Sequence, residues 1–265
     1  MNGIENRKVA LITGAAGGIG AQIARGIAAR DIPVALLDRQ VTPLRELADE
    51  LGATGLPALP IPVDVTSAGE VEAAVEKVEA DLGPIEYLVN AAGVLRVGTV
   101  DELSDNDWTT TLGVNAGGVF HVSRAVTRRM IPRRRGAVVT VASNAASTAR
   151  FGMSAYAASK AAATAFTACL GLELAGYGIR CNTVAPGSTG TRMLTELYEG
   201  VPEAETVAER TSVVGAPESF RVGIPLGKIA SPGDVSEAVL FLLSDGAGHI
   251  TMQTLTVDGG ATLGV

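Results

Sequence analysis

The chain has 265 residues, of which 47 % are hydrophobic and only 4 % aromatic, and its formal net charge is −7. This length and apolar content suit one large α/β domain. The acidic balance argues against broad nucleic-acid binding. There is no apolar run of about 18 residues and no export signal, so we expect no membrane span and a cytoplasmic location. Cys169 and Cys181 lack metal-ligand spacing, and we expect two buried thiols and no metal site.

Strand-like and helix-like segments alternate along the chain. Apolar, β-favouring runs predict strands at residues 8–13, 33–38, 58–63, 86–90, 136–142, 179–185 and 253–257. Helical periodicity predicts helices at residues 18–30, 43–52, 67–82, 104–131, 154–175 and 232–244. This alternation predicts a doubly wound, Rossmann-type α/β fold over residues 1–265, a single domain whose parallel sheet of about seven strands carries helices on both faces.

Residues 190–223 interrupt the alternation. This segment is rich in Thr, Glu and Gly, and its periodicity is weak. It follows Pro186 and Gly187 at the carboxyl edge of the sheet, where ligands bind in such folds. We predict a mobile lid over a substrate; the alternative is an ordinary surface insertion.

A glycine-rich turn joins the first predicted strand to the first predicted helix. In TGAAGGIG (13–20), Gly14, Gly18 and Gly20 follow the strand at once, and a helical pattern begins at Ile19. Such glycines let backbone N–H groups approach a pyrophosphate, and the helix N-terminus favours its negative charge. The turn therefore predicts a dinucleotide site, although its spacing differs from the general G-x-G-x-x-G fingerprint. The alternative is a glycine turn with no ligand.

The second predicted strand ends in Asp38. A carboxylate at that place can accept hydrogen bonds from the adenosine ribose and would repel a 2′-phosphate. The next residue, Arg39, could accommodate such a phosphate, but we expect Asp38 to dominate. The sequence therefore favours NAD over NADP.

Tyr156 and Lys160 lie four residues apart in YAASK, so on a helix they share one face. An ammonium there can lower the pKa of a phenol toward neutrality. A phenol poised in this way can take a proton from an alcohol while hydride leaves the same carbon. Ser143, at the end of an apolar run, could hold the substrate oxygen. A Tyr-x-x-x-Lys by itself is common by chance. It indicates a dehydrogenase site here because the glycine-rich turn at residues 13–20 predicts a dinucleotide site in the same chain.

Several motifs together resemble the short-chain dehydrogenase/reductase family. In chain order they are TGAAGGIG at 13–20, Asp64-Val65, NAAG at 90–93, Asn115, Ser143, YAASK at 156–160 and Pro186-Gly187. The resemblance covers nearly the whole chain. Within the family, stretches such as NAAGVLRVG (90–98) and GIPLGKIA (223–230) resemble the 2,3-dihydro-2,3-dihydroxybenzoate dehydrogenases of catechol siderophore pathways.

The resemblance implies a set of cofactor contacts. It places Asp64 and Val65 beside the adenine, and Asn90, Ala91 and Gly93 next to the adenosine ribose. It also brings Tyr156 and Lys160 to the nicotinamide ribose, Pro186 and Gly187 to the nicotinamide face, and Thr191 to the carboxamide. In the family Asn115 supports a water that links Lys160 to solvent. The family is usually tetrameric, which implies a homotetramer.

The resemblance also implies a small-molecule substrate, a carboxylated cyclohexadiene with hydroxyls on neighbouring ring carbons. A carboxylate calls for a cation or convergent donors. Arg96 and Arg150 are the candidates, and each has the alternative of a solvent-facing loop charge. Met153 could supply an apolar wall for the ring.

Three functions remain open at this stage. The first is oxidation of 2,3-dihydro-2,3-dihydroxybenzoate, and the second is oxidation of 2,3-dihydro-3-hydroxyanthranilate or another cyclic alcohol of a secondary-metabolite pathway. The third is non-catalytic NAD binding by a sensor or scaffold. The intact set of Asn115, Ser143, Tyr156 and Lys160 speaks against the third, because a pure binder has no need for all four.

Overall fold

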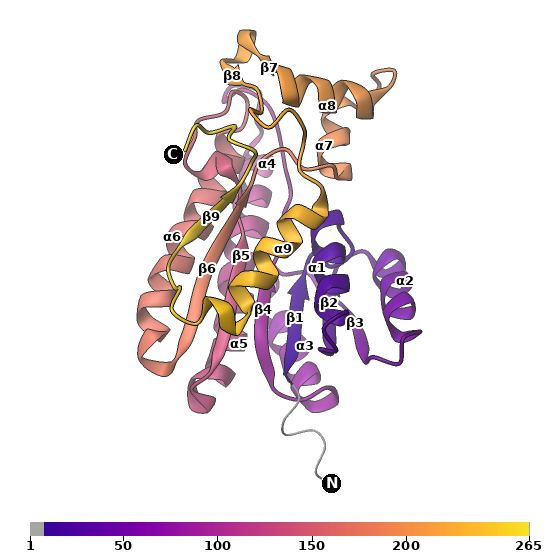
Figure 1. Ribbon diagram of the computed structural model, residues 1–265, viewed down its shortest axis with the longest axis vertical. Coiled ribbons are helices and arrows are strands. Elements are labelled where there is room, and N and C mark those ends of the chain that lie inside the picture. The colour runs from indigo at the N-terminus through magenta and orange to yellow at the C-terminus, as the bar shows by residue number, and fades with distance from the viewer. Residues whose placement is uncertain (1–7, 265) are drawn as a thin grey trace.

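The computed structural model describes residues 8–264, and its centre is a seven-stranded parallel sheet (Figure 1). The strand order is β3-β2-β1-β4-β5-β6-β9. The strands are β1 Val9–Thr13, β2 Val34–Asp38, β3 Ala58–Pro62, β4 Ile85–Asn90, β5 Gly136–Val141, β6 Ile179–Pro186 and β9 Thr254–Val257. Each predicted strand is confirmed to within one residue at either end. These strands could be predicted because a parallel strand covered on both faces is apolar along its length.

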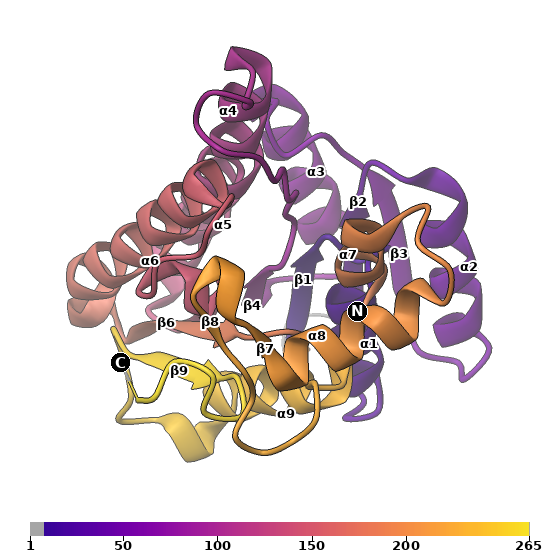
Figure 2. The ribbon, with the colours of Figure 1, turned by 90° about the horizontal axis from the view of Figure 1, so that it is seen from above.

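Helices cover both faces of this sheet, with one apolar cluster on each side (Figure 2). One face carries α1 Gly18–Ala28, α2 Val41–Gly52 and α9 Pro232–Leu243. The other carries α3 Ala68–Asp81, α5 Val119–Arg133 and α6 Ser154–Leu174. The predicted doubly wound architecture is therefore confirmed.

The strand order reverses between β1 and β4, and the loops that follow these two strands touch. Gly14, with φ +68°, approaches the β4 loop so closely that a Cβ on it would lie 2.6 Å from the Ala91 carbonyl oxygen. In open α/β sheets ligands bind at such a switch point, outside the carboxyl ends of the strands. The fold thus creates a crevice beside the glycine-rich turn.

The predicted helix at residues 104–131 is divided in the structure. Helix α4 spans Asp105–Leu112, a π-helical turn spans Gly113–Gly118, and α5 continues to Arg133. Gly118 lets this turn pack closely against Val65, because a Cβ on Gly118 would lie 2.6 Å from Cγ2 of Val65. Single π-helical turns inside helices occur frequently at functional sites, and this one carries Asn115.

Residues 190–223 form short elements above the carboxyl ends of the strands (Figures 1 and 2). They include α7 Arg192–Thr195, α8 Ala204–Val214 and a small antiparallel pair of β7 Gly215–Ala216 with β8 Arg221–Val222. Elements of two to eleven residues leave little periodicity in a sequence, which explains the weak pattern. The mobility of this segment stays a prediction.

One thiol prediction is wrong. Cys181 on β6 is buried, whereas Cys169 on α6 is exposed, because it lies on a helix face that no other described element covers. Within residues 8–264, no helix has the length and apolarity needed to span a bilayer. The same residues contain no cluster of three or more His, Cys, Asp or Glu that could hold a metal ion.

Candidate active site

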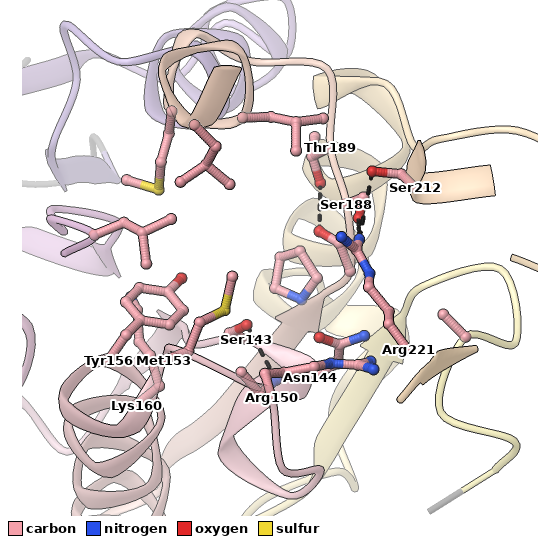
Figure 3. Close-up of a pocket in the computed structure, with 18 of the residues that line it drawn as sticks. Ser143, Asn144, Arg150, Met153, Tyr156, Lys160, Ser188, Thr189, Ser212 and Arg221 are labelled. Carbon is pink, nitrogen blue, oxygen red and sulfur yellow. Dashed lines mark hydrogen bonds between the residues drawn. The ribbon is translucent and has the colours of Figure 1, made fainter. Parts of the chain in front are cut away.

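A cavity of about 240 Å³ lies at the carboxyl edge of the sheet, beneath residues 190–223 (Figure 3). Its walls come from the start of α1, from the loops after β4, β5 and β6, from the start of α6 and from the overlying segment. The predicted site residues that line it are Ile19, Ala91, Gly93, Ser143, Arg150, Met153, Tyr156, Lys160, Pro186, Gly187 and Thr191. The fold therefore brings Ser143, Tyr156 and Lys160 together with the predicted nicotinamide-side residues, whereas the predicted catalytic residue Asn115 is not part of the lining.

The first turns of α6 hold Tyr156 and Lys160 on one face of the helix. The Lys160 ammonium lies 5.7 Å from the centre of the Tyr156 ring and donates a hydrogen bond to the Val141 carbonyl at 3.0 Å. Burial lowers the pKa of Lys160 to about 8. Near neutral pH this group is therefore mainly charged, yet it can give up its proton far more easily than an exposed lysine.

The environment of Tyr156 differs from the predicted one. Burial raises the pKa of the phenol, and a hydrogen bond with the Ser143 hydroxyl lowers it only in part. The predicted lowering of this pKa by Lys160 is not found in the protein by itself, where the loss of solvation is the largest effect. Forming a phenolate here calls for further positive charge close to the ring.

Asn115 joins the loop after β4 to helix α6. Its side-chain Oδ1 accepts from the Val94 N–H at 2.8 Å, and its Nδ2 donates to the Val94 carbonyl and to Ser159 Oγ, both at 2.9 Å. Ser159 Oγ in turn donates to the Tyr156 carbonyl at 2.7 Å. Asn115 is fully buried, so these bonds fix the loop against the helix that carries the Tyr–Lys pair.

Gly93 lies where this loop passes over Lys160. A Cβ on Gly93 would lie 3.2 Å from the Lys160 Nζ and 3.3 Å from the Asn115 Oδ1. Only glycine leaves both groups undisturbed at this point, which explains the glycine of NAAG.

The glycine-rich turn has the features of a phosphate cradle. The N-cap of α1, Gly17, makes no side-chain cap, so the first N–H groups of the helix are open to an anion. A Cβ on Gly20 would collide with the Gly14 carbonyl, and one on Gly18 would lie 2.9 Å from Thr191 Cγ2. Thr191 therefore closes over the turn from the other side of the crevice. This backbone surface fits the pyrophosphate of a dinucleotide.

Asp38 is held at the end of β2 by two backbone donors. Its Oδ2 accepts from the Ala16 N–H at 3.1 Å and its Oδ1 from the Gln40 N–H at 2.9 Å. A carboxylate has further acceptor sites, so ribose hydroxyls can still bind to it. Arg39 is exposed, and its positive charge acts on the carboxylate of Asp64. Hydrogen bonds from Thr66 lower the pKa of Asp64, and Arg39 adds a smaller effect.

The structure does not bring every predicted residue into the cavity. Arg96 is outside the lining and pairs with Asp107 of α4, with 3.5 Å between Nε and Oδ1, so it is not placed to bind a substrate carboxylate. The Asn90 side chain is buried and donates to Ser123 Oγ at 3.0 Å, so only its backbone is available to a ligand. Val65 is likewise buried, with its carbonyl bonded to His121.

Sequence reasoning missed Arg221, which lines the cavity together with Asn144. Arg221 belongs to the two-residue strand β8, where no periodicity marks a site; a lone cation in the run FRVGI was the available signal. Asn144 is held by a bond from its Nδ2 to Asp258 at 3.2 Å. That contact joins segments 114 residues apart, which no local pattern shows.

The short chain dehydrogenase family model matches residues 8–202. The chain belongs to this family. It is 50 % identical over 263 residues to the 2,3-dihydro-2,3-dihydroxybenzoate dehydrogenase of Bacillus subtilis, covering 99 % of this chain and 98 % of that one. It is 39 % identical over 259 residues to the vibriobactin-specific 2,3-dihydro-2,3-dihydroxybenzoate dehydrogenase of Vibrio cholerae, with 97 % of each covered. The crystal structure of an actinorhodin polyketide ketoreductase variant with NADPH superposes with a TM-score of 0.89 at 34 % identity over 97 % of each chain.

Proposed function

We propose that this short-chain dehydrogenase oxidises 2,3-dihydro-2,3-dihydroxybenzoate to 2,3-dihydroxybenzoate with NAD, as a step of siderophore-type biosynthesis. The observation that carries the proposal is a single cavity that combines Ser143, Tyr156 and Lys160 with a half-buried cation, Arg150. The names of the relatives that match almost end to end support the choice of substrate.

The cofactor part of the proposal rests on the crevice between β1 and β4. Gly14, Gly18 and the open N-terminus of α1 suit the pyrophosphate, while Pro186, Gly187 and Thr191 flank the place for the nicotinamide. A nicotinamide dinucleotide supplies the hydride acceptor, and its oxidised ring carries a positive charge. The ketoreductase relative binds NADPH. Here Asp38 lies at the end of β2, where its charge repels a 2′-phosphate, and we infer a preference for NAD.

The chain's own groups then divide the acid–base work. The Ser143 hydroxyl donates a hydrogen bond to the reacting substrate oxygen. Tyr156 takes the hydroxyl proton as hydride leaves the carbon, and the Lys160 ammonium stabilises the phenolate from which Tyr156 acts. Asn115 keeps the β4 loop and α6 in register, so that Lys160 stays in place. The ketone formed lies in a ring that already holds two double bonds, so it tautomerises to an aromatic phenol.

The test is NADH formation by purified protein with 2,3-dihydro-2,3-dihydroxybenzoate, and with 2,3-dihydro-3-hydroxyanthranilate in parallel. We expect rapid reduction of NAD with the diol and release of 2,3-dihydroxybenzoate. Turnover of the amino compound alone would leave the chemistry in place and replace the substrate. Absence of turnover with both would overturn the proposal.

We further propose a cytoplasmic homotetramer. Its support is the outer face of α5 and α6, where Leu172 is 70 % and Phe120 42 % exposed. Covering such apolar side chains in an assembly removes them from water. Light scattering should give about four times the 27.0 kDa of one chain, and a particle of one chain would contradict this.

A further inference from the structure

Two arginines from different parts of the chain line the same cavity. Arg150 lies in the loop between β5 and α6, and Arg221 lies in β8 of the segment 190–223. Figure 3 shows their guanidinium groups on one side of the cavity and the Tyr156 phenol on the other. One arginine thus belongs to the body of the fold and the other to its cover.

The positive charge of this pair is not matched within residues 8–264. Neither guanidinium forms an ion pair there, and the Arg150 side chain donates no hydrogen bond to any of these residues. Burial lowers the pKa of Arg150, and the charge of Arg221 lowers it further. Two like charges held together beside a cavity favour an anion between them.

The one carboxylate within residues 8–264 whose charge acts on Arg150, that of Asp258, is already hydrogen-bonded within the protein. Asp258 raises the pKa of Arg150 slightly, but its oxygens accept hydrogen bonds from Asn144, Thr262 and the Gly260 N–H. Burial would raise the pKa of Asp258, and these bonds keep it below its usual value. One negative charge, engaged in this way, leaves an excess of positive charge at the two arginines.

Arg221 is positioned by neutral partners. Its Nη2 donates to Ser188 Oγ at 2.6 Å and lies 3.4 Å from Ser212 Oγ. Ser188 directly follows Gly187 at the end of β6, and Ser212 is fully buried on α8. The hydroxyls fix the guanidinium without neutralising it, and its remaining N–H donors suit a carboxylate.

We infer that Arg150 and Arg221 together bind the carboxylate of the substrate, and that this anion holds residues 190–223 closed over the cavity. The inference deepens the proposed function and rests on it for the identity of the acid. The class of ligand is a small ring acid, whose carboxylate lies at the arginines while its ring reaches toward Ser143 and Tyr156. We call Arg150 and Arg221 the carboxylate clamp. By fixing the carboxylate, this clamp determines which ring carbon is presented for oxidation.

Binding measurements test the clamp without turnover. Calorimetry with NADH present would compare 2,3-dihydroxybenzoate with its neutral analogue 2,3-dihydroxybenzamide. Arg150→Gln and Arg221→Gln should each weaken binding of the acid about tenfold to hundredfold, because each removes a charged hydrogen bond. Binding of the amide should stay unchanged. Equal affinity for the acid in all variants, or equal losses for acid and amide, would overturn the inference.

Two further variants serve as controls. Arg210→Gln removes an exposed cation from α8 of the same segment, outside the cavity lining, and should leave binding of the acid unchanged. Arg221→Lys keeps the charge and should restore part of the lost affinity. A loss with Arg210→Gln as large as with Arg221→Gln would show a general charge effect and contradict the clamp.

The closing of the segment has its own readout. 2,3-Dihydroxybenzoate should slow amide hydrogen exchange in residues 204–222 of the parent protein and leave it unchanged in Arg221→Gln. Equal protection in both would contradict the role of the anion in closure. If the acid binds through these arginines but the protein does not oxidise the diol, the proposed function is wrong and the clamp stands. If both Gln variants oxidise the diol with the kcat/KM of the parent, the clamp is wrong and the proposed function stands.

Discussion

The Lys160 ammonium lies 5.7 Å from the centre of the Tyr156 ring, and near the start of α6 Lys160 is buried while Tyr156 is half-buried. The burial that places this cation beside the phenol also makes the charge costly to the folded protein. The charge that the proposed reaction needs at Lys160 therefore lowers the stability of the folded protein.

Lys160→Met should stabilise the protein near neutral pH and abolish turnover. The pKa of Lys160 falls from 10.5 to about 8 on folding, so between these values the unfolded chain binds more protons and stability rises with pH. We expect the free energy of unfolding to rise by about 1–3 kcal/mol near pH 7; the loss of the hydrogen bond from Lys160 to the Val141 carbonyl reduces this gain. Denaturant unfolding at several pH values measures it. The difference between variant and parent should shrink as the pH rises from 8 toward 10.5; a constant difference would refute the burial argument.

Asp38→Asn should change the cofactor preference. Asn retains an acceptor for a backbone N–H but removes the negative charge that repels a 2′-phosphate. We expect kcat/KM with NAD to fall about tenfold and kcat/KM with NADP to rise. Steady-state kinetics with both cofactors measure this, with Asp49→Asn on the exposed face of α2 as the matched control. An unchanged ratio of the two cofactors would remove Asp38 from the ribose site.

Asn115→Ala should destabilise the protein and lower kcat. The substitution removes three buried hydrogen bonds, two to Val94 and one to Ser159, and leaves their partners unpaired. The expected cost is about 3 kcal/mol of unfolding free energy. Ser159→Ala removes the bond to Asn115 and the bond to the Tyr156 carbonyl but keeps both bonds between Asn115 and Val94, so it should cost less stability while still lowering kcat. A variant of either kind with full activity would show that this bridge does not position the Tyr–Lys pair.

The sequence predicts the strands, the crevice at the glycine-rich turn and the grouping of Tyr156 with Lys160 because each depends on local patterns. A buried parallel strand reads as an apolar run, and TGAAGGIG and YAASK place their groups through a single turn or helix. The relation of Gly14 to Ala91 follows from the switch point between β1 and β4, so it follows from the predicted fold as well.

Features that depend on distant partners could not be predicted in this way. Arg96 and Arg150 look alike in sequence, but Asp107 pairs with the first and no acid within residues 8–264 pairs with the second. Arg221 reaches the cavity only because the segment 190–223 folds back over the sheet. The raised pKa of Tyr156 depends on burial, which a helical spacing does not reveal.

The most direct measurement compares the parent protein with Tyr156→Phe, using NAD and 2,3-dihydro-2,3-dihydroxybenzoate. Removing the phenol oxygen removes the proton acceptor, so kcat should fall by about 10²–10⁴-fold. NAD affinity, followed by titration of the same two proteins, should stay nearly unchanged. Rapid NADH formation by the parent and almost none by the variant is the predicted result. Turnover by Tyr156→Phe at the parent rate would contradict the assignment of this cavity as the site of alcohol oxidation.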